Sequence, residues 1–140
     1  MAAMTRREAR EEVFRLLFET EFHRGVPAEE VLSLAADDRG FDSTGYIRQV
    51  YLGVQENLAE LDALISRHSR GWRPDRITPV SRSILRLGIY EMRYVDDVPP
   101  TVAINEAVEL TKKFDVEKAR SFVNGVLNGV KDELEAARPS

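Results

Sequence analysis

Residues 101–130 read TVAINEAVELTKKFDVEKARSFVNGVLNGV, and this stretch decides the fold. Apolar residues recur in it every three or four positions, which is the period of an amphipathic helix and not that of a strand. The pattern predicts two helices, at about 101–114 and 117–136. Their expected inward faces carry Ala103, Ile104, Ala107, Val108, Leu110 and Phe114, and then Phe122, Val123, Val126, Leu127, Val130 and Leu134.

The same period extends outward from this stretch toward the N-terminus. It predicts helices at about 5–24, 44–69 and 79–95, and a shorter helix after Pro27. Gly and Pro residues separate these segments, and strand-like alternation is sustained nowhere. The sequence therefore predicts an all-α fold of six to seven helices.

Length and the GWRP break at 71–74 determine the expected domain organisation. A chain of 140 residues is long enough for one hydrophobic core but short for two. We expect a single domain over 1–140, with an N-terminal helical subdomain at about 5–70 and a C-terminal one at about 73–136.

Composition excludes several classes of protein. Apolar residues make up 43% of the chain and charged residues 31%, which is typical of a globular and not a disordered protein. No apolar run approaches the roughly 20 residues that a membrane helix needs. The absence of cysteine excludes disulfides and thiol catalysis and is consistent with a reducing compartment. We expect a cytoplasmic protein with no membrane partner.

The sequence offers no sign of catalysis. The two histidines, His23 and His68, lie far apart in the chain and have no metal-binding spacing. Gly-rich phosphate loops and nucleophile turns are also missing. We therefore predict no catalytic residues, no metal site, no cofactor and no enzymatic activity.

Charge is unevenly distributed along this acidic chain, whose net charge is −4. Residues 67–86 hold six arginines against one aspartate. By charge alone this segment is the favoured site for an anionic partner. A second basic group, Arg6, Arg7 and Arg10, stands at the start of the first helix.

Aromatic residues accompany the N-terminal arginines. Phe14 and Phe18 fall on the same side of the helix as Arg7. One interpretation is that both rings are buried between neighbouring helices; the other is that part of this aromatic edge stays accessible. Arginine for phosphate and a ring for an unstacked base is a common way to hold single-stranded RNA. The helix alone does not decide between the two.

The glycines of SFVNGVLNGV form a second unusual feature. Gly125 and Gly129 lie four residues apart on one helix face, and each costs the helix about 1 kcal/mol relative to alanine. Either a neighbouring helix or a ligand must approach the backbone there. Phe122, close in sequence to Lys118, repeats the pairing of a ring with a cation.

Four segments together resemble the NusB family of bacterial transcription antitermination factors: TRREAREEVFRLLFE, SILRLGIYEM, DVPPTVAINEAVELTKKF and SFVNGVLNGV. The resemblance covers essentially the whole chain. It implies an all-helical fold of two small packed bundles and transcription regulation without catalysis. It also implies binding of the boxA RNA element of ribosomal RNA operons jointly with NusE, a protein of the small ribosomal subunit, within an elongation complex that holds other Nus factors.

The resemblance also implies site residues. Those expected to bind single-stranded RNA are Arg6, Arg7, Arg10, Phe18, Lys118, Phe122 and Asn124, and those expected to face NusE are Ser81 and Arg82. This chain departs from the family pattern at three positions. Glu8 stands where arginine is common, Phe18 replaces tyrosine, and Ser81 replaces a carboxylate found in some members.

Two alternatives to an RNA-binding antitermination factor remain. One is the NusB-like domain of an rRNA cytosine methyltransferase, which the lack of a methyl-donor loop and of cysteine disfavours. The other is a protein-only helical adaptor, or a homodimer that masks its RNA surface.

Overall fold

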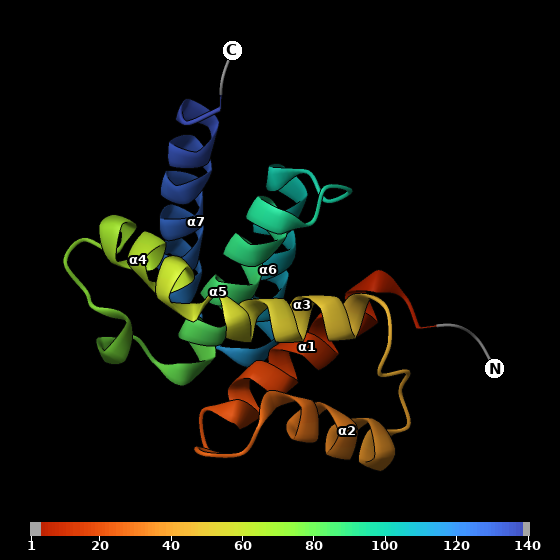
Figure 1. Cartoon of the computed structure of the whole chain (residues 1–140). Coiled ribbons are helices and arrows are strands. Elements are labelled where there is room, and N and C mark those ends of the chain that lie inside the picture. Colours follow the sequence, from red (N-terminus) through yellow and green to blue (C-terminus); the bar gives the residue numbers. More distant parts are fainter. Residues whose placement is uncertain (1–3, 139–140) are drawn as a thin grey trace. The chain divides into compact units, whose positions relative to one another are not determined.

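The structure, a computed structural model, describes residues 4–138, and its regular elements in that range are all helical (Figure 1). Seven α-helices and one short 3-10 helix follow in chain order: α1 (Arg6–Thr20), α2 (Ala28–Arg39), α3 (Tyr46–Glu56), α4 (Leu58–His68), η1 (Pro74–Arg76), α5 (Pro79–Tyr94), α6 (Pro100–Phe114) and α7 (Ala119–Ala136). This confirms the predicted all-α class. Within these residues, the helices are too short or too polar to cross a membrane.

The prediction of one continuous helix over 44–69 is wrong. The backbone of Asn57 (φ −118°, ψ 22°) leaves the helical region, so α3 ends at Glu56 and α4 begins at Leu58. The break is short, because the amide of Leu61 donates to the carbonyl oxygen of Asn57 at 3.0 Å. The apolar period continues across Asn57 since both helices bury a face, and it therefore could not reveal the interruption.

Internal contacts divide the chain into two compact units, residues 1–56 and 57–140. The subdomain division expected near residues 70–73 falls inside the second unit. The organisation as a single domain with two helical subdomains stays a prediction.

The first unit packs α1, α2 and α3 around fully buried apolar residues, among them Val13, Leu16 and Tyr51. The Tyr51 hydroxyl lies 2.6 Å from Thr20 Oγ1, which in turn donates to the carbonyl oxygen of Leu16 at 2.7 Å. Burial raises the pKa of Tyr51. The hydrogen bond offsets the loss of water at the buried Tyr51 hydroxyl, and it links α1 to α3 within the unit.

Two side chains fix the start of α1. Thr5 accepts a hydrogen bond from the amide of Glu8 at 3.0 Å, and Glu8 Oε1 accepts one from the amide of Thr5 at 2.9 Å. This reciprocal capping box satisfies two backbone donors that a helix start leaves open. The same bonds from Thr5 lower the pKa of Glu8. Glu8, which departs from the family pattern, therefore has a structural task here.

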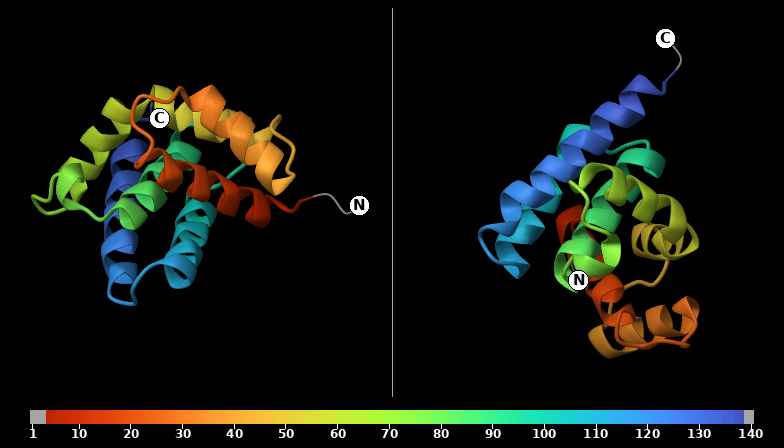
Figure 2. Two further views of the ribbon diagram at one scale, coloured as in Figure 1. Left: turned by 90° about the horizontal axis from the view of Figure 1, so that it is seen from below. Right: turned by 90° about the vertical axis from the view of Figure 1, so that its left-hand side faces the viewer.

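The second unit is built around α5. Ten of its sixteen residues are buried, whereas a surface helix buries one stripe only. Helices α4, α6 and α7 pack against it, and α6 and α7 lie side by side in both views of Figure 2. Gly88 permits the close approach, since a Cβ there would lie 3.2 Å from a δ-methyl of the buried Leu127 and 3.5 Å from Cβ of Ala107.

Polar pairs attach α4 to α5. Arg86 donates to both carboxylate oxygens of Asp62 at 2.8 Å, and Glu60 accepts from the hydroxyl of Tyr94 at 2.6 Å and from Arg93 at 3.1 Å. The two-bond Arg86–Asp62 geometry is the stronger and more directional kind of ion pair.

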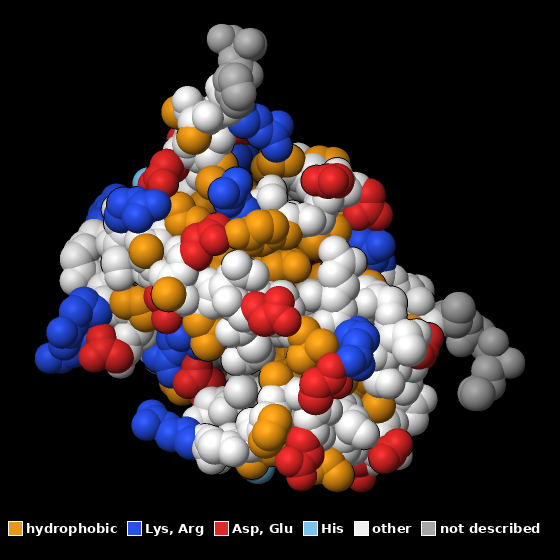
Figure 3. All heavy atoms as spheres, viewed as in Figure 1, with side chains coloured by type: hydrophobic (Ala, Val, Ile, Leu, Met, Phe, Trp, Pro, Cys, Tyr) orange, Lys and Arg blue, Asp and Glu red, His pale blue; other side chains and the backbone are white. Residues whose placement is uncertain are grey.

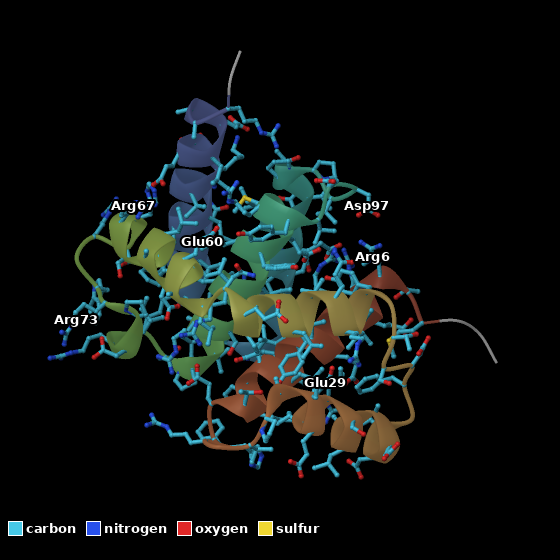
Figure 4. The ribbon with its side chains drawn as sticks, viewed as in Figure 1. Arg6, Glu29, Glu60, Arg67, Arg73 and Asp97 are labelled. Carbon is cyan, nitrogen blue, oxygen red and sulfur yellow. The ribbon has the colours of Figure 1, made fainter. Side chains whose placement is uncertain are left out.

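The C-terminal end of α4 is attached to α7. Arg67 Nη2 lies 2.6 Å from Glu133 Oε2, and His68 Nε2 lies 2.7 Å from Glu133 Oε1. Figure 4 shows Arg67 near the end of α4 and Glu60 at its beginning. The bonds from Arg67, followed by those from His68, lower the pKa of Glu133 to about 2.

We expect Gly88→Val to lower the free energy of unfolding by about 1–3 kcal/mol, because its methyl groups would enter space already filled by Leu127 and Ala107. Urea denaturation followed by far-UV circular dichroism measures this change. Ala59→Val, at an exposed position of α4, is the matched control and should change stability by less than about 1 kcal/mol. Equal stability of Gly88→Val and the wild type would contradict the close approach.

Glu133 should make the stability of the second unit depend on pH. Because its pKa is lowered to about 2 from 4.5, its contacts stabilise the folded state fully above pH 4.5, and this stabilisation is lost as the pH falls toward 2. We expect Glu133→Gln to be less stable than the wild type at neutral pH and the difference to shrink over that acid range. Denaturant titrations at several pH values measure it.

The control for this experiment is Glu135→Gln, which removes a carboxylate from the same helix at an exposed position. It should leave the pH dependence near that of the wild type. A Glu133→Gln variant that keeps the wild-type dependence would show that the Arg67 and His68 contacts do not stabilise the fold.

Candidate nucleic-acid interface

The predicted site residues fall in both units. Arg6, Arg7, Arg10 and Phe18 belong to α1 in the first unit; Ser81, Arg82, Lys118, Phe122 and Asn124 belong to the second. Each set is described within its own unit. That the first and last helices form one RNA surface stays a prediction.

Tyr46, the first residue of α3, lies among the N-terminal arginines. The guanidinium carbon of Arg6 is 4.4 Å from the centre of the Tyr46 ring, and that of Arg10 is 6.0 Å from it. Both distances are within the range of cation–π attraction. Arg6 and Arg7 are exposed, but Arg10 is only 3% exposed. Arg6 and Arg7 thus present their charge outward, whereas Arg10 is largely part of the packed unit.

Three phenylalanine rings contact one another in sequence: Phe14 and Phe18 of α1, and Phe22 just beyond its end. The ring centres of Phe14 and Phe18 are 6.1 Å apart and those of Phe18 and Phe22 are 5.1 Å apart. Phe14 is buried, Phe18 is half-buried and Phe22 is 63% exposed. Phe14, the ring nearest the arginines, is therefore in the core as the first interpretation expects, Phe18 is partly accessible as the second expects, and the most exposed ring, Phe22, lies away from the arginines.

In the second unit, the predicted residues of α7 lie on different sides of the helix. Lys118 immediately precedes α7 and is exposed, and Phe122, four residues later, is half-buried on the same side. Asn124 is exposed and lies about 160° around the helix from Phe122 by the shorter way. Asn128 donates to the backbone and side-chain oxygens of Asn124 at 2.8 and 3.2 Å.

One side of Phe122 borders a hollow of about 330 Å³, which we call the apolar groove. Trp72 and Val116, both more than half exposed, contribute its apolar surface. Ser81 lines it too but is only 5% exposed, and its hydroxyl donates to Asp115 Oδ2 at 2.5 Å. The lining consists of Trp72, Arg76, Ile77, Thr78, Ser81, Asp115, Val116, Lys118, Ala119 and Phe122.

The other side of Phe122 borders a second hollow of about 380 Å³, which we call the polar hollow. It is lined by His68, Ser69, Arg70, Ser121, Phe122, Gly125 and Val126. Phe122 therefore separates an apolar surface from a polar one, both within the second unit.

Arg82 does not line the apolar groove but bonds the backbone of the η1 segment next to it. Its Nη1 donates to the carbonyl oxygens of Pro74 and Ile77 at 2.8 and 2.7 Å, which fixes the short η1 segment. Ser81 and Arg82, the residues predicted to face a protein partner, thus both make bonds that define this groove. A direct contact of either side chain with the partner stays a prediction.

The structure accounts for part of the arginine excess in 67–86. Three of the six arginines form ion pairs within the second unit: Arg67 with Glu133, Arg73 with Asp75 and Arg86 with Asp62. Arg82 donates to the carbonyl oxygens of Pro74 and Ile77. Figure 4 labels Arg67 and Arg73, and in Figure 3 basic and acidic side chains are interspersed. The number of arginines in 67–86 therefore overstates the positive charge that this segment offers to an anionic partner.

Arg70 and Arg76 are the exceptions. Both are exposed and make no ion pair with the residues that the structure describes. Arg70 lines the polar hollow and Arg76 lines the apolar groove. Nothing in the sequence distinguishes these two arginines from the other four of the segment.

The two glycines of α7 have different surroundings. A Cβ at Gly129 would lie 2.6 Å from Nδ1 of His68, so of the two alternatives a neighbouring helix, α4, approaches the backbone there. A Cβ at Gly125 would meet nothing within 4 Å. Among residues 4–138, three or more His, Cys, Asp or Glu side chains nowhere gather in a way that could hold a metal ion.

Comparison with known proteins yields consistent matches. The model of the NusB family matches residues 7–132. The transcription antitermination protein NusB of Natranaerobius thermophilus is 40% identical over 139 residues, covering 96% of this chain and all of the relative. That of Bacillus subtilis is 42% identical over 132 residues, covering 94% of this chain and 98% of the relative.

Solved structures agree with these sequence matches. NusB of T. maritima superposes with a TM-score of 0.87 at 36% identity, covering 94% of each chain. A crystal structure of the antitermination factors NusB and NusE in complex with dsRNA gives a TM-score of 0.80 at 27% identity, covering 91% of this chain and 96% of the other.

Proposed function

The chain belongs to the NusB family, and from this we propose that it binds the boxA RNA of ribosomal RNA operons together with NusE. As a member of this family it is a transcription antitermination factor and not an enzyme. In the proposed role it acts in the cytoplasm, within an elongation complex that includes other Nus factors. It supports processive transcription of ribosomal RNA genes by positioning its partners, without making or breaking bonds.

The position of Phe122 between two unlike surfaces is the observation that carries this proposal. An aromatic ring flanked by unpaired cations suits an unstacked base and its phosphates. Arg70, Arg76 and Lys118 lie around the two hollows that Phe122 lines and make no ion pair with described residues. Asn124 adds an exposed polar side chain on the other side of α7 from Phe122.

The first unit would contribute a second RNA contact. Arg6 and Arg7 present exposed charge at the beginning of α1, and the half-buried ring of Phe18 lies on the same helix. In the proposed complex the arginines neutralise phosphates and Phe18 stacks on or flanks a base. Arg10, which is buried near Tyr46, would help to position Arg6 and Arg7.

The apolar groove is the proposed docking site of NusE. Its exposed Trp72 and Val116 offer apolar surface for a protein partner, and an exposed tryptophan is a frequent anchor of protein interfaces. Ser81 lines this groove, Arg82 bonds the backbone of Pro74 and Ile77 beside it, and the resemblance implies that both residues face NusE. RNA and NusE would then meet at Phe122, which supports joint binding.

We expect the wild type to bind a fluorescent boxA-type single-stranded RNA and NusE to tighten this binding. Replacing both Arg6 and Arg7 by alanine should remove two phosphate contacts and flatten the log–log salt slope by about 1.4. Fluorescence anisotropy at two salt concentrations measures both effects. A duplex RNA of the same sequence serves as the comparison ligand and should bind more weakly.

Each outcome of this titration has a defined meaning. If the double variant binds with the wild-type slope, the N-terminal arginines do not contact RNA. If neither protein binds RNA with or without NusE, the chain acts as a protein-only adaptor or as a homodimer. The exposed Phe22 next to Phe18 offers surface for such a second copy.

Trp72→Ala tests the protein-docking part of the proposal. Loss of an anchor residue should weaken NusE binding by at least about tenfold while leaving the affinity for RNA alone near that of the wild type. Leu34→Ala, which removes an equally exposed apolar side chain from α2, is the control. Isothermal titration with NusE provides the measurement, and unchanged affinity of Trp72→Ala would place NusE elsewhere.

A further inference from the structure

Gly125 lies in the interior of α7 without a packing reason for its missing side chain. It is exposed, its backbone is not left-handed, and a Cβ there would meet nothing within 4 Å. Glycine is the least favourable residue after proline in a helix interior. Folding alone would therefore favour alanine at this position, and the open backbone calls for a partner outside the chain.

The polar hollow that Gly125 lines already contains groups suited to a nucleotide. Phe122 supplies a ring, and the serines at 69 and 121 line the same hollow. His68 closes one wall, since its Nε2 is bonded to Glu133 and its ring fills the space above Gly129.

Arg70 lies at this hollow in an unusual backbone conformation. Its φ is +54°, and Gly71 follows with φ +87°, so two left-handed residues end the segment after α4. A non-glycine residue in this region is strained, and such strain persists only where the surroundings hold it. The fully buried Ser69 holds it here by donating to the carbonyl oxygen of Trp72.

The helix geometry relates Gly125 to the predicted RNA contacts. Gly125 lies about 60° around α7 from Phe122 and about 100° from Asn124, on the exposed arc between them. A strand of RNA that touches both Phe122 and Asn124 must cross the helix at this point. Because glycine has no side chain, a ligand can approach the helix backbone at Gly125 more closely than it could at any other residue type.

We infer that the polar hollow is a nucleotide subsite on a single-stranded RNA path across α7. The ring of Phe122 stacks on a base, Arg70 neutralises a phosphate, and Gly125 lets the sugar–phosphate chain lie directly against the helix. Ser121 is placed to bond a ribose hydroxyl. This inference rests on the proposed RNA-binding function and assigns a role to two residues, Arg70 and Gly125, outside the predicted site.

Gly125→Ala separates this role from a structural one, because the two predict opposite effects. Alanine should raise Tm by about 2–5 °C through helix propensity. It should also weaken binding of the fluorescent boxA-type RNA by about 5- to 150-fold, because the added methyl group holds the sugar–phosphate chain off the helix and the base away from the ring of Phe122, at the cost of one base stack. Ser33→Ala, at an exposed position of α2, is the control for propensity alone and should leave RNA affinity unchanged.

Arg70→Gln tests the subsite independently of the helix. It should flatten the log–log salt slope by about 0.7, one phosphate contact on a single strand. Arg73→Gln is the matched control, because Arg73 lies in the same segment but is 3.5 Å from Asp75 and lines neither hollow. Its slope should remain close to that of the wild type.

The outcomes distinguish the inference from the function on which it rests. RNA binding by the wild type with unchanged affinity of Gly125→Ala overturns the subsite and leaves the proposed function standing. A lowered Tm for Gly125→Ala, or equal slopes for Arg70→Gln and Arg73→Gln, also overturns it. Absence of RNA binding by the wild type overturns both.

Discussion

The approach of α5 to α6 and α7 at Gly88 is the contact on which the second unit depends. Because α5 is buried on most of its circumference, it cannot be displaced without exposing apolar surface on three neighbouring helices. Leu127 packs over Gly88, and this fixes the rotation of α7 about its own axis. With Val123, Val126 and Val130 turned inward, Phe122 and Gly125 are left at the surface, where the two hollows lie.

Charge acts in this protein mainly as an internal connector and only locally as a recognition feature. Glu133 and Asp62 neutralise arginines that would otherwise give the 67–86 segment a strong positive field. The cations left over are few and stand beside an aromatic ring. An acidic protein can bind an anionic polymer through such a local group of cations. Salt screens charges that lie more than about 8 Å away, so the distant acidic residues repel the polymer only weakly. The local set of charges then matters more than the net charge.

Much of the fold could be predicted from the sequence, because apolar periodicity reports directly on helices. The division at Asn57 could not, since the apolar faces of α3 and α4 continue the same period. The Thr5–Glu8 capping box follows the spacing of Thr and Glu that is typical of a helix start. The resemblance implies Phe122 and Lys118 as RNA contacts, the structure brings both to one groove, and their contact with RNA stays a prediction. The different surroundings of Gly125 and Gly129 could not be predicted from the sequence, because they depend on the position of the His68 ring, which is distant in the chain.

The capping box at the beginning of α1 has an evolutionary consequence. Position 8 is subject to two opposing demands, since a carboxylate there completes the helix start and an arginine would add a cation beside Arg7. A single substitution cannot satisfy both, because it would remove the acceptor for the amide of Thr5. Positions 5 and 8 should therefore covary among descendants of this chain. A lineage that gains a cation at position 8 would lose the reciprocal capping bond and leave the exposed amide of Thr5 to water.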